Sequence, residues 1–278
     1  MDAKTALITG CSSGIGRATA RRFLAEEWVV YATARNPADI QTLGEHEAAR
    51  LATLDVTDAE DVERVTERMV EEEGRIDCVV NNAGFGQHGP VEDVPIDDVH
   101  RQFDVNVYGP HRLVRRVLPQ MREQGDGTIV NLSSVQGRIA LPGTAPYSSS
   151  KHALEAMSDA LRSEVADFGV DVVLVEPGPV ATSFQDRVED ELPADEERTL
   201  HAYGWLYDLI DDWEAISGDG PLSSGPEAVA RVVVDAASVS DPAARYPVGP
   251  VAKAGEYTRF LPDSSRERII RLVKRLTT

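Results

Sequence analysis

Short apolar runs rich in β-branched residues recur along the chain and alternate with longer segments of helical composition. Continuous apolar runs of this length are typical of strands that are buried on both faces of a sheet. Because strands that alternate with helices form a parallel sheet covered on both sides, we predict an α/β fold, a doubly wound parallel sheet. The predicted strands are Thr5–Thr9, Trp28–Ala34, Arg50–Leu54, Ile76–Asn81, Thr128–Ser133 and Val170–Glu176, and the predicted helices include Gly16–Glu27, Ala59–Glu73, Asp97–Arg122 and Tyr147–Phe168.

The alternation becomes less regular after Gly178. Arg245–Pro250 is a weaker candidate for a last strand. Asp186–Asp219 is acidic, rich in aromatic residues and largely helical in pattern, and the turn residues of SGDGPLSSGP interrupt it. We expect one domain over residues 1–278, with residues 183–225 forming a substrate loop or lid. The alternative is an amphipathic helix over Tyr203–Trp213 that only packs on the body or on another subunit.

The chain is strongly acidic, with 47 Asp and Glu against 28 Lys and Arg and a formal net charge of -19. Such an excess repels nucleic-acid phosphates and anionic lipids, so we expect neither nucleic acid nor membrane as a partner. Only four of the basic residues are lysines. This composition resembles that of proteins from halophilic archaea, and the alternative is an ordinary acidic protein from a GC-rich genome.

Little in the sequence favours a metal site or an extracellular location. The two cysteines, Cys11 and Cys78, have no metal-site or disulfide spacing, and no apolar run approaches the ~20 residues of a membrane span. The N-terminus enters a strand at once, without the features of a signal peptide, so we expect a cytoplasmic protein. The histidines lack ligand spacing, and we leave out of the site, as surface or packing residues, His88, His111, His152 and His201.

A glycine-rich turn, LITGCSSGIGRATA, joins the first predicted strand to the first predicted helix. Gly10, Gly14 and Gly16 allow a tight turn and a close approach of the backbone to a pyrophosphate, which the N-terminus of the helix attracts. In this strand-turn-helix context the motif predicts a dinucleotide site. Ser12 or Ser13 could donate a further hydrogen bond to the ligand.

The end of the second predicted strand bears on the choice of cofactor. Enzymes that prefer NAD usually carry an acid there, but this chain has Arg35, whose guanidinium suits the 2′-phosphate of NADP. An exposed loop arginine is the plain alternative. Asp55, before Val56, is placed to meet the adenine, and Asn82 follows the fourth strand. We therefore expect NADP(H) as the preferred cofactor, with NAD(H) as the alternative.

Tyr147 and Lys151 are four residues apart at the start of a predicted helix, so they should project from one face. A cation beside a tyrosine favours the phenolate, which would make Tyr147 a working acid or base. Ser134 follows the fifth strand, at the edge where such sheets bind ligands. Asn106 lies within a predicted helix although asparagine is a middling helix former.

Taken together and in this order, TGCSSGIG, NNAG, Asn106, Ser134, YSSSK and EPGPVAT resemble the short-chain dehydrogenase/reductase family in its compact form. The resemblance covers at least Thr5–Thr182. Within the family, GCSSGIG, YATAR, NNAGFGQHGP and VEPGPVAT are most similar to the branch of 17β-hydroxysteroid and retinol dehydrogenases. The resemblance to the family implies a single-domain Rossmann-like fold. Members of the family usually form homodimers or homotetramers through their long helices.

The resemblance also implies an activity, the interconversion of a secondary alcohol and a ketone or aldehyde with NADP(H). Tyr147 would be the general acid and base, Ser134 would bind the substrate oxygen, Lys151 would lower the pKa of the tyrosine and bind the nicotinamide ribose, and Asn106 would hold a proton-relay water. The cofactor contacts that it implies are Gly10, Ser12, Ser13, Gly14, Ile15, Gly16, Arg35, Asp55, Val56, Asn82, Ala83, Gly84, Tyr147, Lys151, Pro177, Gly178, Val180 and Thr182.

Two other functions compete with this interpretation. The first is a non-catalytic sensor or scaffold that has kept the nucleotide site, but such relatives usually lose a catalytic residue and all four are present here. The second is an epimerase or dehydratase acting on nucleotide sugars, which resembles a longer chain with a differently spaced glycine loop. The substrate itself cannot be inferred from the sequence.

The charge of the chain generates a first prediction. Mutual repulsion among acidic groups at a net charge of -19 should destabilise the fold in dilute buffer, and salt should screen that repulsion. We expect the melting temperature, followed by circular dichroism, to rise between low salt and ~2 M KCl. A flat or falling melting temperature would contradict the interpretation that the composition is a salt adaptation.

Overall fold

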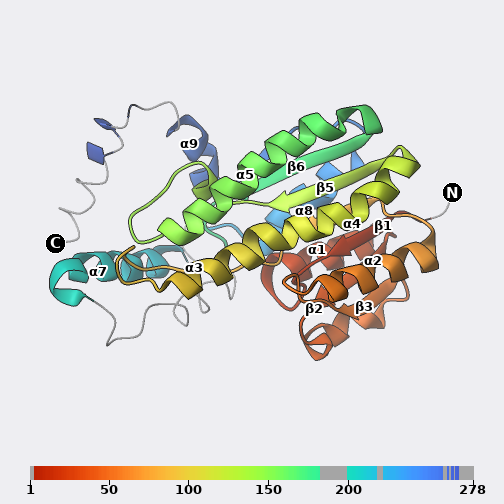
Figure 1. Ribbon diagram of the computed structural model, residues 1–278, viewed down its shortest axis with the longest axis horizontal. Helices are drawn as coiled ribbons and strands as arrows, with labels where there is room; N and C mark the ends of the chain where they lie inside the picture. Colours follow the sequence, from red (N-terminus) through yellow and green to blue (C-terminus); the bar gives the residue numbers. More distant parts are fainter. Residues whose placement is uncertain are drawn as a thin grey trace.

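Seven parallel strands form one sheet in the computed structural model, in the order β3-β2-β1-β4-β5-β6-β7 (Figure 1). The structure describes residues 3–181, 199–217 and 222–258, and beyond them 262, 264, 265, 267 and 268. The predicted sheet is confirmed, including the weaker last strand. The strands are β1 (Thr5–Ile8), β2 (Val29–Ala34), β3 (Ala49–Thr53), β4 (Cys78–Asn81), β5 (Gly127–Leu132), β6 (Val170–Pro177) and β7 (Arg245–Val248).

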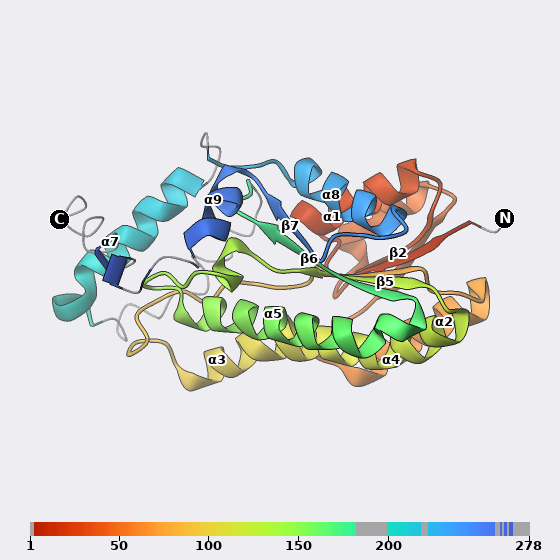
Figure 2. The same ribbon diagram turned by 90° about the horizontal axis from the view of Figure 1, so that it is seen from above.

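Helices cover both faces of the sheet, as predicted for a doubly wound fold. Figure 2 shows α1 and α8 on one face and α2, α4 and α5 on the other. The α-helices are α1 (Gly14–Ala25), α2 (Ala59–Glu73), α3 (Ile96–Phe103), α4 (Gly109–Gln124), α5 (Ala145–Val165), α7 (Leu200–Ser217), α8 (Pro226–Ser238) and α9 (Pro250–Thr258). Shorter helical segments are η1 (Pro37–Glu45), η2 (Asp104–Tyr108), η3 (Val135–Gly137) and η4 (Ala166–Phe168).

The core consists of two apolar layers, one on each face of the sheet. Successive residues of β1 serve different layers: Ile8 packs with Phe23 of α1, and Leu7 packs with Met69 of α2 and Leu113 of α4. Because side chains alternate along a strand, a strand covered on both faces must be apolar at every position. This explains why the strands appear in the sequence as continuous apolar runs.

The predicted helix Asp97–Arg122 is interrupted, and the prediction of one continuous helix is wrong. A π-helical turn, η2, separates α3 from α4. Pro110 has no N–H to donate to the carbonyl of Asn106 four residues earlier, so the regular α-helical pattern cannot continue through this point. Gly109 follows the turn, and a Cβ added to this glycine would lie only 2.9 Å from Val56. The interruption places Asn106 inside the turn.

Two points concern the class of protein. Within the ranges that the structure describes, no helix is long and apolar enough to cross a bilayer. The same ranges hold no group of three or more His, Cys, Asp or Glu side chains arranged to bind a metal ion.

Helix α7 lies at the end of the molecule opposite to the N-terminus (Figure 1), beyond the carboxyl ends of the strands.

Candidate active site

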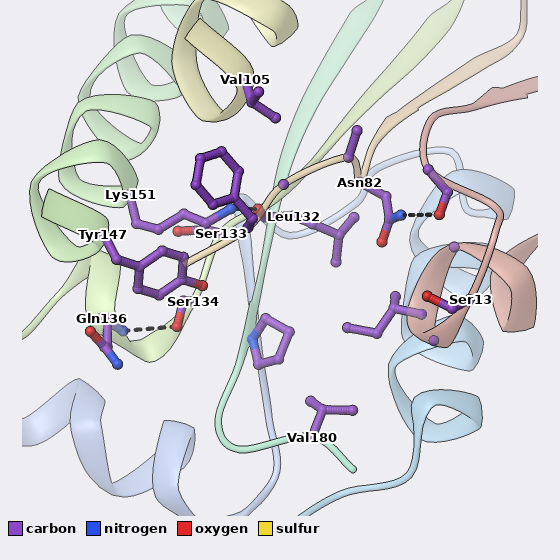
Figure 3. Close-up of a pocket in the computed structure, with 18 of the residues that line it drawn as sticks. Ser13, Asn82, Val105, Leu132, Ser133, Ser134, Gln136, Tyr147, Lys151 and Val180 are labelled. Carbon is purple, nitrogen blue, oxygen red and sulfur yellow. Dashed lines mark hydrogen bonds between the residues drawn. The ribbon is translucent and has the colours of Figure 1, made fainter. Parts of the chain in front are cut away.

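A cavity of about 580 Å³ lies at the carboxyl edge of the sheet. Figure 3 shows Tyr147 and Lys151 on one side of it and Ser13 and Asn82 on the other. Almost all predicted site residues are brought together here. Those that line the cavity are Gly10, Ser12, Ser13, Gly14, Ile15, Gly16, Arg35, Asp55, Val56, Asn82, Ala83, Gly84, Ser134, Tyr147, Lys151, Pro177, Gly178 and Val180. Thr182 lies outside the described residues, and Asn106 lies behind the wall.

The glycine loop has the geometry of a nucleotide cradle. Gly10 and Gly14 have φ values of 72° and 51°, a region that favours glycine. A Cβ on Gly16 would lie 2.3 Å from the Gly10 carbonyl oxygen and 2.4 Å from the Asn82 side-chain nitrogen, so no larger residue fits. The turn therefore brings bare backbone and the first N–H groups of α1 to the cavity, which suits a pyrophosphate.

Thr9 and Asn82 hold this cradle in place. The Asn82 amide donates to the Thr9 and Gly10 carbonyls at 2.8 and 3.1 Å, and the backbone N–H groups of Asn82 and Ala83 donate to the Thr9 hydroxyl at 3.0 and 2.9 Å. Sequence reasoning missed Thr9, because its role depends on the pairing of β1 with β4 and not on any local motif. The contacts fix the loop before a ligand arrives.

The adenosine end of the cavity carries Arg35 and Asp55. Arg35 is exposed directly after β2, where an acid would favour NAD. The Asp55 carboxylate accepts hydrogen bonds from the backbone N–H and the hydroxyl of Thr57 at 2.9 and 2.7 Å, which fixes its side chain after β3. The residues at this end fit the ribose and adenine of a dinucleotide.

Tyr147, Lys151 and Ser134 meet at the other end of the cavity. The Lys151 ammonium donates to the Leu132 carbonyl at 2.7 Å and lies 5.7 Å from the centre of the Tyr147 ring. In Figure 3 the Tyr147 hydroxyl points toward Ser134, whose own hydroxyl accepts from the Gln136 N–H at 3.1 Å. The pair from α5 and the serine after β5 are therefore joined in one constellation.

Burial governs the protonation of this pair. It raises the pKa of Tyr147 to about 12, against the opposing effect of the hydrogen bond with Ser134. It also lowers the pKa of Lys151 to about 8, and the negative charge of Glu155 opposes that shift. The lowered pKa of Tyr147 that was expected from Lys151 is therefore not found in the ligand-free protein, because burial outweighs the lowering effect. Tyr147 is a protonated phenol at neutral pH, suited to give a proton to a substrate oxygen.

Asn106 supports the cavity wall from behind. Its side chain exchanges hydrogen bonds with the backbone of Phe85, donating at 3.0 Å and accepting at 3.2 Å, and it also donates to the Ser150 hydroxyl at 3.2 Å. These contacts tie the π-helical turn to the loop after β4 and to α5. A role in holding a relay water stays a prediction.

Comparison with known proteins identifies the family. Residues 4–193 match the family model described as short chain dehydrogenase. This chain belongs to the short-chain dehydrogenase family. It is therefore an oxidoreductase that acts on CH–OH groups with NAD(P).

Individual relatives agree with this assignment. An NADPH-dependent 3-dehydrocapnine reductase of Ornithobacterium rhinotracheale is 33% identical, with 98% of each chain covered. Human 17-beta-hydroxysteroid dehydrogenase type 1 is 36% identical over 86% of this chain and 76% of its own, in line with the predicted branch. A short-chain dehydrogenase structure from Streptomyces avermitilis has a TM-score of 0.80 and 32% identity, covering 98% of this chain and 97% of its own.

A buried network of charges lies near the Tyr147 end of the cavity in this short-chain dehydrogenase. Arg138 donates to Glu176 at 2.8 Å, and Arg245 lies 3.3 Å from Glu176 and 3.2 Å from Glu155. The two Glu side chains are almost fully buried, and burial together with the neighbouring Glu155 raises the pKa of Glu176. The network joins the segment after Ser134 to α5, β6 and β7.

Helix α7 gives a partial answer to the lid prediction. Its Tyr207 hydroxyl donates to Asp93 at 2.7 Å, and Leu206 and Ile210 pack beside Gly143. None of the described side chains of α7 is among the residues that line the cavity. The described part of the helix thus packs on the body, as in the alternative interpretation. The rest of the predicted loop lies outside the described residues, apart from 199 and 222–225.

Several lining residues were not predicted from the sequence. The cavity wall also includes Phe85, Val105, Ile139, Leu141 and Val251 together with His88, Arg101 and Gln136. The apolar members have no local motif that separates them from core residues. His88 could have been suspected from its place after NNAG, but it was set aside with the other histidines.

The charge network leads to a stability prediction. Arg138→Met should lower the free energy of unfolding by about 3 kcal/mol, because it removes a cation from two buried carboxylates. Arg22→Ala, which removes an exposed pair with Glu26, should cost less than about 1 kcal/mol. Urea unfolding at neutral pH measures both. Equal losses would show that the buried network contributes no more than a surface pair.

Proposed function

We propose that this short-chain dehydrogenase interconverts an apolar secondary alcohol and its ketone, with NADP(H) as the preferred cofactor. The observation that carries the proposal is the meeting of Tyr147, Ser134 and Lys151 at one end of a cavity whose other end is the glycine loop. A carbonyl group bound at the first end would be in reach of a proton donor and of a dinucleotide that extends from the second.

The residues divide the work as follows. The nicotinamide, when bound, supplies or accepts the hydride at the substrate carbon. Ser134 and the Tyr147 hydroxyl hydrogen-bond the substrate oxygen, and Tyr147 moves the matching proton. Lys151, held by the Leu132 carbonyl, supplies a positive charge that favours the phenolate left behind after proton donation.

Two features support the finer parts of the proposal. For the cofactor, Arg35 occupies the position after β2, and the 3-dehydrocapnine reductase relative is NADPH-dependent by name. For the substrate, the cavity wall carries Phe85, Ile139 and Leu141, which suit a ketone on an apolar skeleton. A ketone of this kind fits better than a charged sugar.

The proposal also covers the partners, the location and the assembly of the enzyme. We expect small-molecule substrates only, with no nucleic-acid or membrane partner, in agreement with the net charge of -19. Two buried free cysteines are in keeping with a cytoplasmic location. Assembly as a homodimer or homotetramer through the long helices stays a prediction. A non-catalytic sensor or scaffold would instead bind the dinucleotide without turning over any alcohol or ketone.

Tyr147→Phe is the direct test of the chemistry. It removes the proton donor and keeps the ring, so we expect turnover with ketones and NADPH to fall at least about a hundredfold while NADPH binding stays nearly unchanged. Tyr108→Phe is the control, because Tyr108 is half exposed and does not line the cavity. A Tyr147→Phe enzyme within about tenfold of wild type would rule the mechanism out.

Arg35→Asp tests the cofactor preference. The change removes the partner of the 2′-phosphate and adds a like charge, so the ratio of kcat/KM with NADPH to that with NADH should fall at least about thirtyfold. Arg21→Asp makes the same change of charge on an exposed face of α1 and should leave the ratio unaltered. A wild-type enzyme that already prefers NADH would refute the assignment to Arg35.

A further inference from the structure

His88 is buried in the wall of the cavity close to Tyr147. Its ring meets the Tyr147 ring edge to face, with 6.2 Å between the centroids and 64° between the planes. Only 6% of the residue is exposed, and it lines the same cavity as Ser134 and Lys151. The residue therefore sits where the part of a substrate nearest the reacting carbon must lie.

The Nε2 atom of His88 has no hydrogen-bond partner among the described residues, although the backbone around the ring is held firmly. This nitrogen is also shielded from solvent. The Gln87 N–H donates to the Gln102 side chain at 2.6 Å, Gln102 donates to the Phe85 carbonyl at 2.7 Å, and the Gly89 N–H donates to Gly143 at 2.8 Å. The ring is thus presented in a fixed position with its Nε2 atom unused.

A buried polar atom without a partner destabilises the protein that carries it, because water no longer solvates it. Native structures keep such atoms rarely, and often at functional sites. Burial lowers the pKa of His88 to about 4, so the ring is neutral at physiological pH and offers one donor and one acceptor. It can pair with an uncharged hydroxyl or carbonyl group.

Two other polar side chains of the cavity wall, Gln136 and Arg101, already have partners. The Gln136 side-chain oxygen accepts from Ser148 at 2.9 Å. Arg101 pairs with Asp98 at 3.2 Å and lies over the Phe85 ring. The neighbouring Ile139 and Leu141 are apolar. His88 is accordingly a buried polar group of the cavity wall that remains to recognise a ligand.

We propose that His88 determines specificity by hydrogen-bonding a second oxygen, a hydroxyl or carbonyl group carried next to the reacting carbon of an otherwise apolar substrate. This inference rests on the proposed function and narrows its substrate class. A ketone with such an oxygen satisfies the buried imidazole, whereas a plain ketone leaves it unpaired. One neutral hydrogen bond to a buried group corresponds to about tenfold or more in kcat/KM.

The test compares two ketones of equal length, methyl hexyl ketone and hydroxymethyl hexyl ketone. The wild-type enzyme should favour the hydroxy ketone in kcat/KM by about tenfold or more, and His88→Leu should abolish that preference. His88→Gln keeps a donor and an acceptor and should retain much of it. A preference that is absent in the wild type, or unchanged in His88→Leu, would overturn the role of His88 while turnover of the plain ketone upholds the proposed function.

A second measurement needs no turnover. Since Leu replaces an unpartnered polar ring, the melting temperature of ligand-free His88→Leu should equal or exceed that of the wild type. A fall of several degrees would mean that the imidazole is structural and would overturn the inference. If neither ketone is turned over, the proposed function fails. In that case binding still tests the role of His88. The hydroxy ketone should raise the melting temperature of the wild type with NADP(H) present, and this rise should be lost in His88→Leu.

Discussion

The contact between the Lys151 ammonium and the Leu132 carbonyl constrains much of this molecule. A buried cation is costly unless backbone or side-chain groups solvate it, and here a carbonyl at the end of β5 does so at 2.7 Å. This contact requires β5 to end at Leu132 and α5 to pack on the sheet so that Lys151 reaches that end. Tyr147, one turn earlier on the same helix, is thereby set opposite Ser134. The arrangement of these three side chains therefore depends on the solvation of one charge.

The parts of the fold that the sequence predicts are those with a local cause. A strand covered on both faces has to be apolar at each position, so β1 and β5 can be recognised in the sequence as continuous apolar runs. The glycine loop is equally local, because Gly16 faces a carbonyl oxygen that leaves no space for a Cβ. The order of motifs then places Tyr147, Lys151 and Ser134 at the same sheet edge without knowledge of any contact.

The parts that escaped prediction depend on contacts between distant segments. Arg138 follows η3, and Glu155, Glu176 and Arg245 belong to α5, β6 and β7, yet in the sequence each is an ordinary charged residue. The π-helical turn has a cause in Pro110, but the helical periodicity around it hides the interruption. His88 resembles the other histidines until the chain is folded and its ring is found against Tyr147. These residues differ from exposed residues of the same type in being buried. Hydrophobic periodicity does not predict burial at single positions in loops.

The two thiols occupy the centre of this construction. Cys11 follows β1 and Cys78 belongs to the adjacent β4, and both are fully buried. Burial raises the pKa of Cys11 to about 12 and also raises that of Cys78, so the reactive thiolate is scarce as well as shielded. An alkylating reagent reaches them only when the middle strands separate. The rate at which the native enzyme reacts with such a reagent therefore measures how often the centre of its sheet opens, and no cysteine has to be introduced for the experiment.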